Sequence, residues 1–282
     1  MYPEAMSPLH PRRAILLLSL AVVLFYGLVI VFFASMETAL IFPAPEDSPE
    51  HLARSAGAQG AEELWLETDS GETIYGWRIG QGEDLAILFT GNASGVGLEP
   101  DRYRVLSELG FSVLHLNYPG YPGSSGRPSE RALEETARAA WAEARRTHAA
   151  DQIVLYGKSL GGFAVLSLAS ELGASGGEQP RAAVVESSFS SVLELAGEFY
   201  PWLPIRLFLE NRMASVDRAP DVTMPVLLLH GRADDLIDIE HSRRLHAAIP
   251  DSSLIELEDL GHNENLGASG LGNKGLGDFL RD

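Results

Sequence analysis

The chain has 282 residues, 45% of them hydrophobic, a composition that supports a large buried core and argues against intrinsic disorder. Its formal net charge is −18 and it carries no cluster of Lys and Arg, which excludes nucleic acid as a partner because phosphate contacts need such clusters. The absence of cysteine excludes disulfides, thiolate zinc sites and a cysteine nucleophile.

Residues 14–33 form the first predicted element. They are 20 uncharged residues, which span about 30 Å as a helix and so match the hydrocarbon core of a bilayer. Arg12 and Arg13 precede this stretch, and Glu37 follows it. Because positive flanks stay in the cytoplasm, we expect a single-pass membrane protein with the rest of the chain on the outer, extracytoplasmic side.

Two other interpretations of this stretch are weaker. A cleaved signal peptide usually has a shorter apolar run and small residues before the cleavage site, whereas Phe33 stands where a small side chain is preferred. A buried core helix would carry a polar stripe, which this stretch lacks. The sequence therefore predicts an uncleaved transmembrane anchor at 14–33 behind a short tail, 1–13.

Residues 34–60 are predicted to link the anchor to a folded domain, because 43–60 are rich in Pro, Gly, Ala, Ser and acidic residues. The domain covers 61–282, a length that suits one α/β domain better than two. Its first two predicted strands, 64–68 and 73–77, flank the turn sequence Asp-Ser-Gly-Glu and indicate a hairpin at an antiparallel edge.

Beyond the hairpin, short apolar runs alternate with helical stretches. The predicted strands are 85–89, 112–117, 153–156, 182–185, 226–230 and 253–257, and the predicted helices are 101–109, 130–147, 161–172 and 240–248. Strands that are apolar throughout and separated by helices indicate a mostly parallel sheet with helices on both faces. The tail, 267–277, is Gly-rich and carries little signal.

A nucleophile is predicted at Ser159. The sequence Gly157-Lys158-Ser159-Leu160-Gly161 lies between a buried strand and a helix, and G-x-S-x-G in that setting forms a sharp turn that lifts the serine hydroxyl above the sheet. Glycine is needed on both sides because a side chain there would collide with the strand and the helix. The first N–H groups of the helix lie beside the serine, where they can stabilise an oxyanion.

The serine needs a base, and the base needs a carboxylate that orients it. Strand 226–230 ends at Gly231, and Asp234 follows three residues later, at the sheet edge where catalytic groups converge. We expect Asp234 to be the acid, with Asp235 and Asp238 as alternatives. If none of the three acts in catalysis, this acidic cluster is a solvated loop.

The base is predicted to be His262. Among the eight histidines, it alone lies in a glycine-flanked loop directly after the last predicted strand, 253–257. That position satisfies the chain order Ser, Asp, His found on sheets of this kind.

Several motifs together resemble one known family. They are 89–93, 117–121, 123–126, 128–130, 157–162, 186–189, 230–234 and 261–263, which span nearly all of the predicted domain in order. The chain is similar in them to membrane-anchored α/β-hydrolases related to the serine aminopeptidase-like group, including its depalmitoylase-like branch. This resemblance implies the α/β-hydrolase fold and a Ser159, Asp234 and His262 triad.

The resemblance also implies an oxyanion hole formed by the backbone N–H groups of Asn92 and Leu160. The turn at Gly91 and Asn92 is by itself a weak signal, because many strands end in such a turn. The family usually has His before this Gly-Asn pair, and here that position is Thr90.

The predicted reaction is acyl transfer to water from an ester, thioester or amide, most simply as a carboxylesterase or acyl hydrolase. The partner is then a small-molecule or lipid-like acyl substrate; no cofactor or metal is expected, because no His, Asp and Glu spacing resembles a zinc site. Residues 190–221 either cap the substrate pocket or form a helix packed on the sheet. The rival functions are an amidase or peptidase on the same fold and a noncatalytic anchored scaffold.

Overall fold

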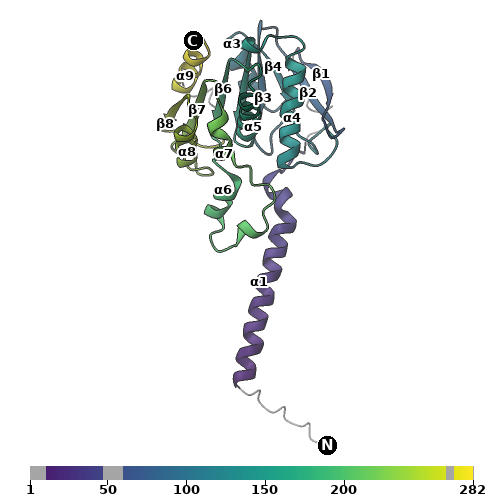
Figure 1. Ribbon diagram of the computed structural model, residues 1–282, viewed down its shortest axis with the longest axis vertical. Coiled ribbons are helices and arrows are strands. Elements are labelled where there is room, and N and C mark those ends of the chain that lie inside the picture. The colour runs from purple at the N-terminus through teal and green to yellow at the C-terminus, as the bar shows by residue number, and fades with distance from the viewer. Residues whose placement is uncertain (1–10, 47–59, 265–269, 282) are drawn as a thin grey trace, which may run out of the picture.

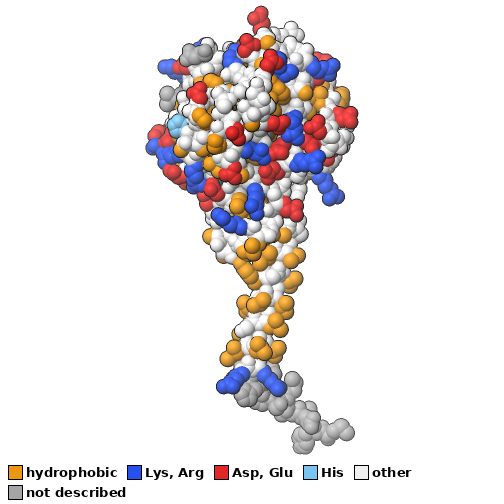
Figure 2. Space-filling model, in the orientation of Figure 1, with side chains coloured by type: hydrophobic (Ala, Val, Ile, Leu, Met, Phe, Trp, Pro, Cys, Tyr) orange, Lys and Arg blue, Asp and Glu red, His pale blue; other side chains and the backbone are white. Residues whose placement is uncertain are grey.

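The computed structural model describes residues 11–46, 60–264 and 270–281. Its N-terminal helix α1 (Pro11–Ile41) projects from a single α/β domain (Figure 1). Apolar side chains surround the projecting part of α1, and Lys or Arg side chains lie at its far end (Figure 2). The helix is long and apolar enough to cross a membrane, with a mean hydropathy of 3.0 over its most apolar window.

The structure extends this helix beyond the predicted anchor. Residues 34–41, expected to belong to the linker, are helical and continue α1 up to the domain. The predicted tail, except for 11–13, and most of the remaining linker, 47–59, lie outside the described residues.

The sheet has eight strands in the order β1-β2-β4-β3-β5-β6-β7-β8. The β1–β2 and β2–β4 pairs are antiparallel and the other five pairs are parallel, so the predicted hairpin at an antiparallel edge and the mostly parallel sheet are confirmed. The strands are β1 (Glu62–Glu67), β2 (Thr73–Ile79), β3 (Asp84–Phe89), β4 (Phe111–Leu116), β5 (Ile153–Lys158), β6 (Ala182–Glu186), β7 (Val226–Gly231) and β8 (Ser252–Leu257).

Helices cover both faces of the sheet because successive strand residues point to opposite sides. Ile87 and Leu155 lie in one core cluster with residues of α4, α5 and α8, whereas Leu88 and Tyr156 lie in a second cluster with residues of α3 and α9. These helices are α3 (Pro100–Glu108), α4 (Glu130–Ala144), α5 (Leu160–Ser175), α8 (Glu240–Ala248) and α9 (Gly270–Arg281), and a 3-10 turn, η2 (Ala150–Gln152), precedes β5.

Helix α9 covers most of the Gly-rich tail, in which the sequence carries little signal. Its glycines lower its intrinsic helix propensity, but Leu276 and Leu280 are buried on the sheet. A Cβ atom at Gly275 would lie 2.4 Å from Ile255 Cδ1, so glycine permits the close approach of α9 to β8. Tertiary packing therefore stabilises a helix that local sequence does not favour.

The segment 190–221 falls into two parts, and its role as a cap over the substrate pocket stays a prediction. Its first part contains α6 (Val192–Phe199) and η3 (Ile205–Leu207), which lie below the sheet beside the upper end of α1 (Figure 1). We call residues 192–209 the cap segment. The second part, with α7 (Ser215–Arg218) and η4 (Ala219–Asp221), packs against α5 in the main core.

Candidate active site

The turn between β5 and α5 holds Ser159 in an unusual backbone conformation. Its φ is 50° and its ψ is −116°, which a non-glycine residue adopts only at a cost of roughly 1–3 kcal/mol. The Ser159 N–H donates to the Glu186 carbonyl at 2.8 Å, and Ser188 Oγ donates to the Ser159 carbonyl at 2.8 Å. These bonds to the neighbouring strand and its loop hold the strained residue in place.

The glycines of this turn are needed for space. A Cβ atom at Gly157 would lie 2.3 Å from the carbonyl oxygen of Gly161, and one at Gly161 would lie 2.1 Å from the carbonyl oxygen of Phe89. Both contacts are with backbone atoms, which cannot swing away as a flexible side chain could. The spacing of G-x-S-x-G thus follows from the close crossing of α5 over β3 and β5.

Asp234 and His262 meet above the end of β7. Asp234 Oδ2 accepts a hydrogen bond from His262 Nδ1 at 2.8 Å, while Asp234 Oδ1 accepts from the N–H groups of Leu236 at 3.0 Å and Ile237 at 2.8 Å. Because a carboxylate only accepts, the His262 proton lies on Nδ1. In the neutral ring, Nε2 is then free to accept a proton.

The other two aspartates have different surroundings. Asp238 Oδ1 accepts from the Glu240 N–H at 2.8 Å at the start of α8. The side chain of Asp235 is exposed and makes no hydrogen bond or ion pair with any residue that the structure describes. Of the three candidates, the fold thus brings only Asp234 to His262.

His230, held by Ser242, lies beside the same Asp234 oxygen that His262 contacts. His230 Nε2 lies 3.3 Å from Asp234 Oδ2 and 2.9 Å from the Ile237 carbonyl, to which it donates, and its Nδ1 accepts from Ser242 Oγ at 2.6 Å. Burial disfavours the charged carboxylate, but the bonds from His230, His262 and the Ile237 N–H outweigh burial and hold the pKa of Asp234 below its usual range.

Ser159 and His262 line one polar cavity of about 310 Å³. Within the described part of the chain, no hydrogen bond joins Ser159 Oγ to the His262 ring. Such a bond is often long in a substrate-free hydrolase and tightens when substrate binds. Sequence reasoning did not assign Lys158, which lines the same cavity.

The loop that carries Asn92 lies beside Ser159. A Cβ atom at Gly91 would be 3.3 Å from Ser159 Cβ, so the Gly91 backbone lies close to the Ser159 side chain. Among the described residues, no acceptor takes the N–H of Asn92 or of Leu160. Both predicted oxyanion donors are therefore present near Ser159 and unpaired, and their role stays a prediction.

Thr90, which replaces the histidine usual in the family, is supported by a histidine from β4. His115 Nδ1 accepts from Tyr103 Oη at 2.7 Å, and His115 Nε2 lies 3.3 Å from Thr90 Oγ1. Burial, with the nearby Arg102 guanidinium, lowers the pKa of His115 to about 3, so the ring is neutral at ordinary pH. This buried network fixes the start of the loop that carries Asn92, which is the predicted oxyanion loop.

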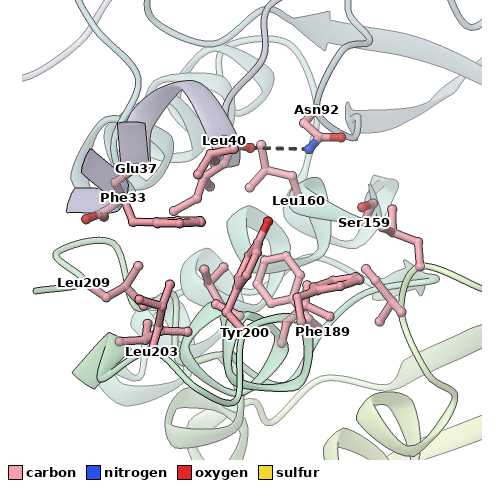
Figure 3. A pocket seen from close by; sticks show the side chains of 18 of the residues that line it. Phe33, Glu37, Leu40, Asn92, Ser159, Leu160, Phe189, Tyr200, Leu203 and Leu209 are labelled. Carbon is pink, nitrogen blue, oxygen red and sulfur yellow. Dashed lines mark hydrogen bonds between the residues drawn. The ribbon is translucent and has the colours of Figure 1, made fainter. Parts of the chain in front are cut away.

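A second cavity, of about 350 Å³, adjoins Ser159 on the side of α1 and is mostly apolar (Figure 3). In the close-up, Phe33 and Leu209 lie at one end of the cavity and Ser159 at the other. Four parts of the chain line it. They are Phe33, Glu37, Leu40 and Ile41 of α1; Asn92, Ser159 and Leu160; Phe189 together with residues of the cap segment; and Leu236 and Ile237 after β7.

Sequence reasoning missed the contribution of α1 to this cavity. Phe33 was assigned to the anchor, and Leu40 to the linker. Hydropathy measures how apolar a stretch is and does not say which side of a long helix contacts protein. The one available signal was Glu37, a charged residue one turn beyond the apolar stretch, whose buried carboxylate accepts hydrogen bonds from backbone N–H groups of 210–211.

Comparisons with known proteins identify relatives over most of the chain. No family model matches it. The uncharacterized protein Rv2307c of Mycobacterium tuberculosis is 32% identical over 243 residues, which cover 84% of this chain and 84% of that protein. Alpha/beta hydrolase domain-containing protein 17C of Xenopus laevis is 28% identical over 255 residues, covering 82% of this chain and 78% of its own.

Solved structures share the fold at low sequence identity. The esterase Pf2001 of Pyrococcus furiosus has a TM-score of 0.63 with 17% identity and covers 84% of this chain and 94% of its own. Mouse alpha/beta hydrolase domain-containing protein 10 has a TM-score of 0.60 with 18% identity, over 79% of this chain and 98% of its own. The finer branch predicted from the motifs stays a prediction, whereas the sequence relatives and the shared fold together confirm the resemblance to α/β-hydrolases: the chain belongs to the α/β-hydrolase family.

Proposed function

We propose that the chain is a serine hydrolase that cleaves an ester or thioester of an acyl substrate, with Ser159 as nucleophile, His262 as base and Asp234 as the orienting acid. The observation that carries the proposal is the Asp234–His262 hydrogen bond of 2.8 Å, at the cavity into which the strained Ser159 turn opens. A noncatalytic scaffold would need none of this geometry.

In the proposed first half-reaction, His262 Nε2 takes the Ser159 hydroxyl proton as Oγ bonds to the acyl carbon. The resulting oxyanion accepts hydrogen bonds from the N–H groups of Asn92 and Leu160. Collapse breaks the bond to the leaving oxygen or sulfur, which departs with the proton from His262. Water then attacks the acyl-enzyme with the same assistance, releases the carboxylic acid and restores Ser159.

Two cavities meet at Ser159, and their linings suggest which of them binds the acyl half of the substrate and which binds the leaving group. The apolar cavity suits the acyl half, because its lining offers little to a charged group apart from Glu37. The polar cavity, with Lys158 and Glu99 in its wall, suits a hydrophilic leaving group. An amidase that binds a charged peptide terminus would need charged side chains in the cavity for the acyl half. We therefore favour the acyl hydrolase. An esterase with the same fold supports this choice.

We also propose that α1 anchors the enzyme in a membrane, with the domain on the extracytoplasmic side. The proposal rests on the apolar length of α1 and on Arg12 and Arg13 at its far end. The full-length chain should resist extraction by alkaline carbonate, and protease added to the outer side should digest the domain. A protected domain in permeabilised cells would indicate the opposite orientation.

A fluorophosphonate probe tests the catalytic proposal directly. It should label the wild-type protein at Ser159, and Ser159→Ala should abolish both labelling and hydrolysis of a short soluble ester such as p-nitrophenyl butanoate. Ser175→Ala, which changes an exposed serine at the end of α5, is the matched control and should keep both. Labelling that persists in Ser159→Ala would refute the assignment.

A further inference from the structure

The end of α1 is docked onto the catalytic domain by polar contacts. Tyr26 Oη donates to the Trp202 carbonyl at 2.6 Å, and the Glu37 carboxylate accepts from the N–H of Asn211 at 2.7 Å and from that of Glu210 at 3.1 Å. One turn further along, Asn92 Nδ2 lies 3.4 Å from the Ile41 carbonyl (Figure 3). The helix therefore touches both the cap segment and the oxyanion loop.

The same helix supplies one wall of the apolar cavity. Phe33 packs edge-on against Tyr200 and Trp202 of the cap segment, with ring centroids 5.0 and 6.0 Å apart. Phe33 and Leu40 face the cavity across from Tyr200, and Ser159 lies at the opposite end (Figure 3). An acyl chain whose carbonyl rests at Ser159 would thus extend along the cavity toward Phe33.

The outer end of the cavity lies at the level where α1 becomes apolar. Phe33 is the last residue of the apolar stretch 14–33, and the contact of Tyr26 with the cap segment lies about 10 Å further into it. If the stretch spans the bilayer, the cap segment meets the membrane surface.

The side chains of the cap segment fit that surface. Phe199, Trp202 and Leu207 are 50%, 55% and 83% exposed, although all three are large and apolar. Trp is enriched at membrane interfaces, and an adjacent Arg206 can extend its guanidinium to the head groups. Among the described residues, nothing shields these three side chains from solvent, whereas a bilayer beside α1 would bury them.

We propose that the apolar cavity is an acyl-chain site opening on the bilayer, so that a long acyl ester or thioester enters from the membrane with Phe33 and Leu40 of α1 against its chain. The inference rests on the proposed function, because it assigns the acyl half of the substrate of that hydrolase. The anchor is then part of the substrate site as well as a tether.

Two adjacent phenylalanines of α1 provide a matched test. Phe33 lines the cavity, whereas Phe32 is 59% exposed and does not. The full-length protein, reconstituted in phosphatidylcholine vesicles, is assayed with butanoyl and hexadecanoyl esters and with the corresponding thioesters. Burial of each methylene tightens binding about fourfold. Phe33→Ala should therefore lower the kcat/KM for the hexadecanoyl substrate, relative to that for the butanoyl substrate, at least tenfold, with esters and with thioesters alike. Phe32→Ala should leave the ratio unchanged.

Fluorophosphonate labelling of Ser159 separates the possible failures. If wild type is not labelled and hydrolyses no ester, the proposed function is wrong. If wild type is labelled but the ratio is flat with chain length, or falls equally in Phe32→Ala and Phe33→Ala, the acyl-chain site is wrong and the hydrolase stands. A labelled Phe33→Ala protein shows that the variant has folded.

The position of the cap segment has its own readout. Lipids brominated near the head group should quench part of the tryptophan fluorescence, and Trp202→Phe should remove most of that quenched component. Quenching that is equal in wild type and in Trp202→Phe would place the cap segment away from the bilayer and overturn entry from the membrane.

Discussion

Replacement of Asp234 by Asn tests the chemistry of the site with the smallest change of shape. The carboxylate accepts three hydrogen bonds, two on Oδ1 and one on Oδ2, and His230 Nε2 lies 3.3 Å from Oδ2. In Asn, Oδ1 can still accept from the N–H groups of Leu236 and Ile237, which directs the NH₂ group toward His262. That group only donates, so His262 Nδ1 must become the acceptor and its proton must move to Nε2.

The wrong tautomer removes the base, because Nε2 then carries a proton where it has to accept one from Ser159. A loss on the order of 10⁴ in kcat is expected, which corresponds to about 5.5 kcal/mol of transition-state stabilisation. The loss of a buried charge-assisted hydrogen bond should also lower the free energy of unfolding by about 1.5–3 kcal/mol.

The assay is hydrolysis of p-nitrophenyl butanoate by full-length protein in detergent, with the unfolding midpoint measured in parallel. Asp235→Asn is the control, because it makes the same chemical change on an exposed neighbour without a hydrogen-bond partner among the described residues. A loss of less than tenfold in Asp234→Asn, or an equal loss in Asp235→Asn, would refute the reasoning from the Asp234–His262 bond.

Three further outcomes are expected. Folding holds the pKa of Asp234 below its value in the unfolded chain. The stability that the Asp234 carboxylate contributes is therefore present above about pH 4 and is lost as the pH falls below that value. Between about pH 5 and pH 3, the unfolding free energy of wild type should drop more steeply than that of Asp234→Asn. Gly161→Ala should destabilise by about 3 kcal/mol or prevent folding, because its Cβ would meet a strand carbonyl at 2.1 Å, whereas Gly197→Ala, with nothing within 4 Å, should not destabilise; thermal unfolding measures both. Glu37→Ala should lower the unfolding midpoint and speed proteolysis between α1 and the domain, while Glu46→Ala, at an exposed position, should do neither.

The sheet could be predicted because its strands are buried on both faces. Strands such as 85–89 and 226–230 are apolar throughout, whereas apolar residues recur with the helical period in the segments between them. The type and the order of the elements could therefore both be predicted. Residues that lie at strand ends come together at one edge, which is why Ser159, Asp234 and His262 could be named before their contacts were known.

Features that depend on contacts distant in sequence could not be predicted. Helix α9 is held by the burial of Leu276 and Leu280, which local propensity does not show. The bracing of Asp234 by His230 and Ser242 depends on how α8 packs beside β7. In each case the structure of one segment depends on its contact with another segment, and the sequence pattern of a single segment does not reveal that contact.

An enzyme that acts on membrane acyl chains has to bring the chain to its active site without exposing it to water, and the placement of the two cavities suits that requirement. Each methylene drawn from lipid into water costs about 0.8 kcal/mol, so the 14 or so methylenes of a hexadecanoyl chain would cost about 11 kcal/mol. On the proposed acyl-chain site, a wall made by Phe33 and Leu40 would let the chain pass from lipid to protein without that cost. The hydrolytic water and the leaving group need the opposite surroundings, and on the same proposal they would meet Ser159 from the polar cavity that His262 lines. On the proposed assignment, the nucleophile therefore has to stand where the two cavities join, and a domain separated from α1 would keep its triad while losing the apolar half of its site.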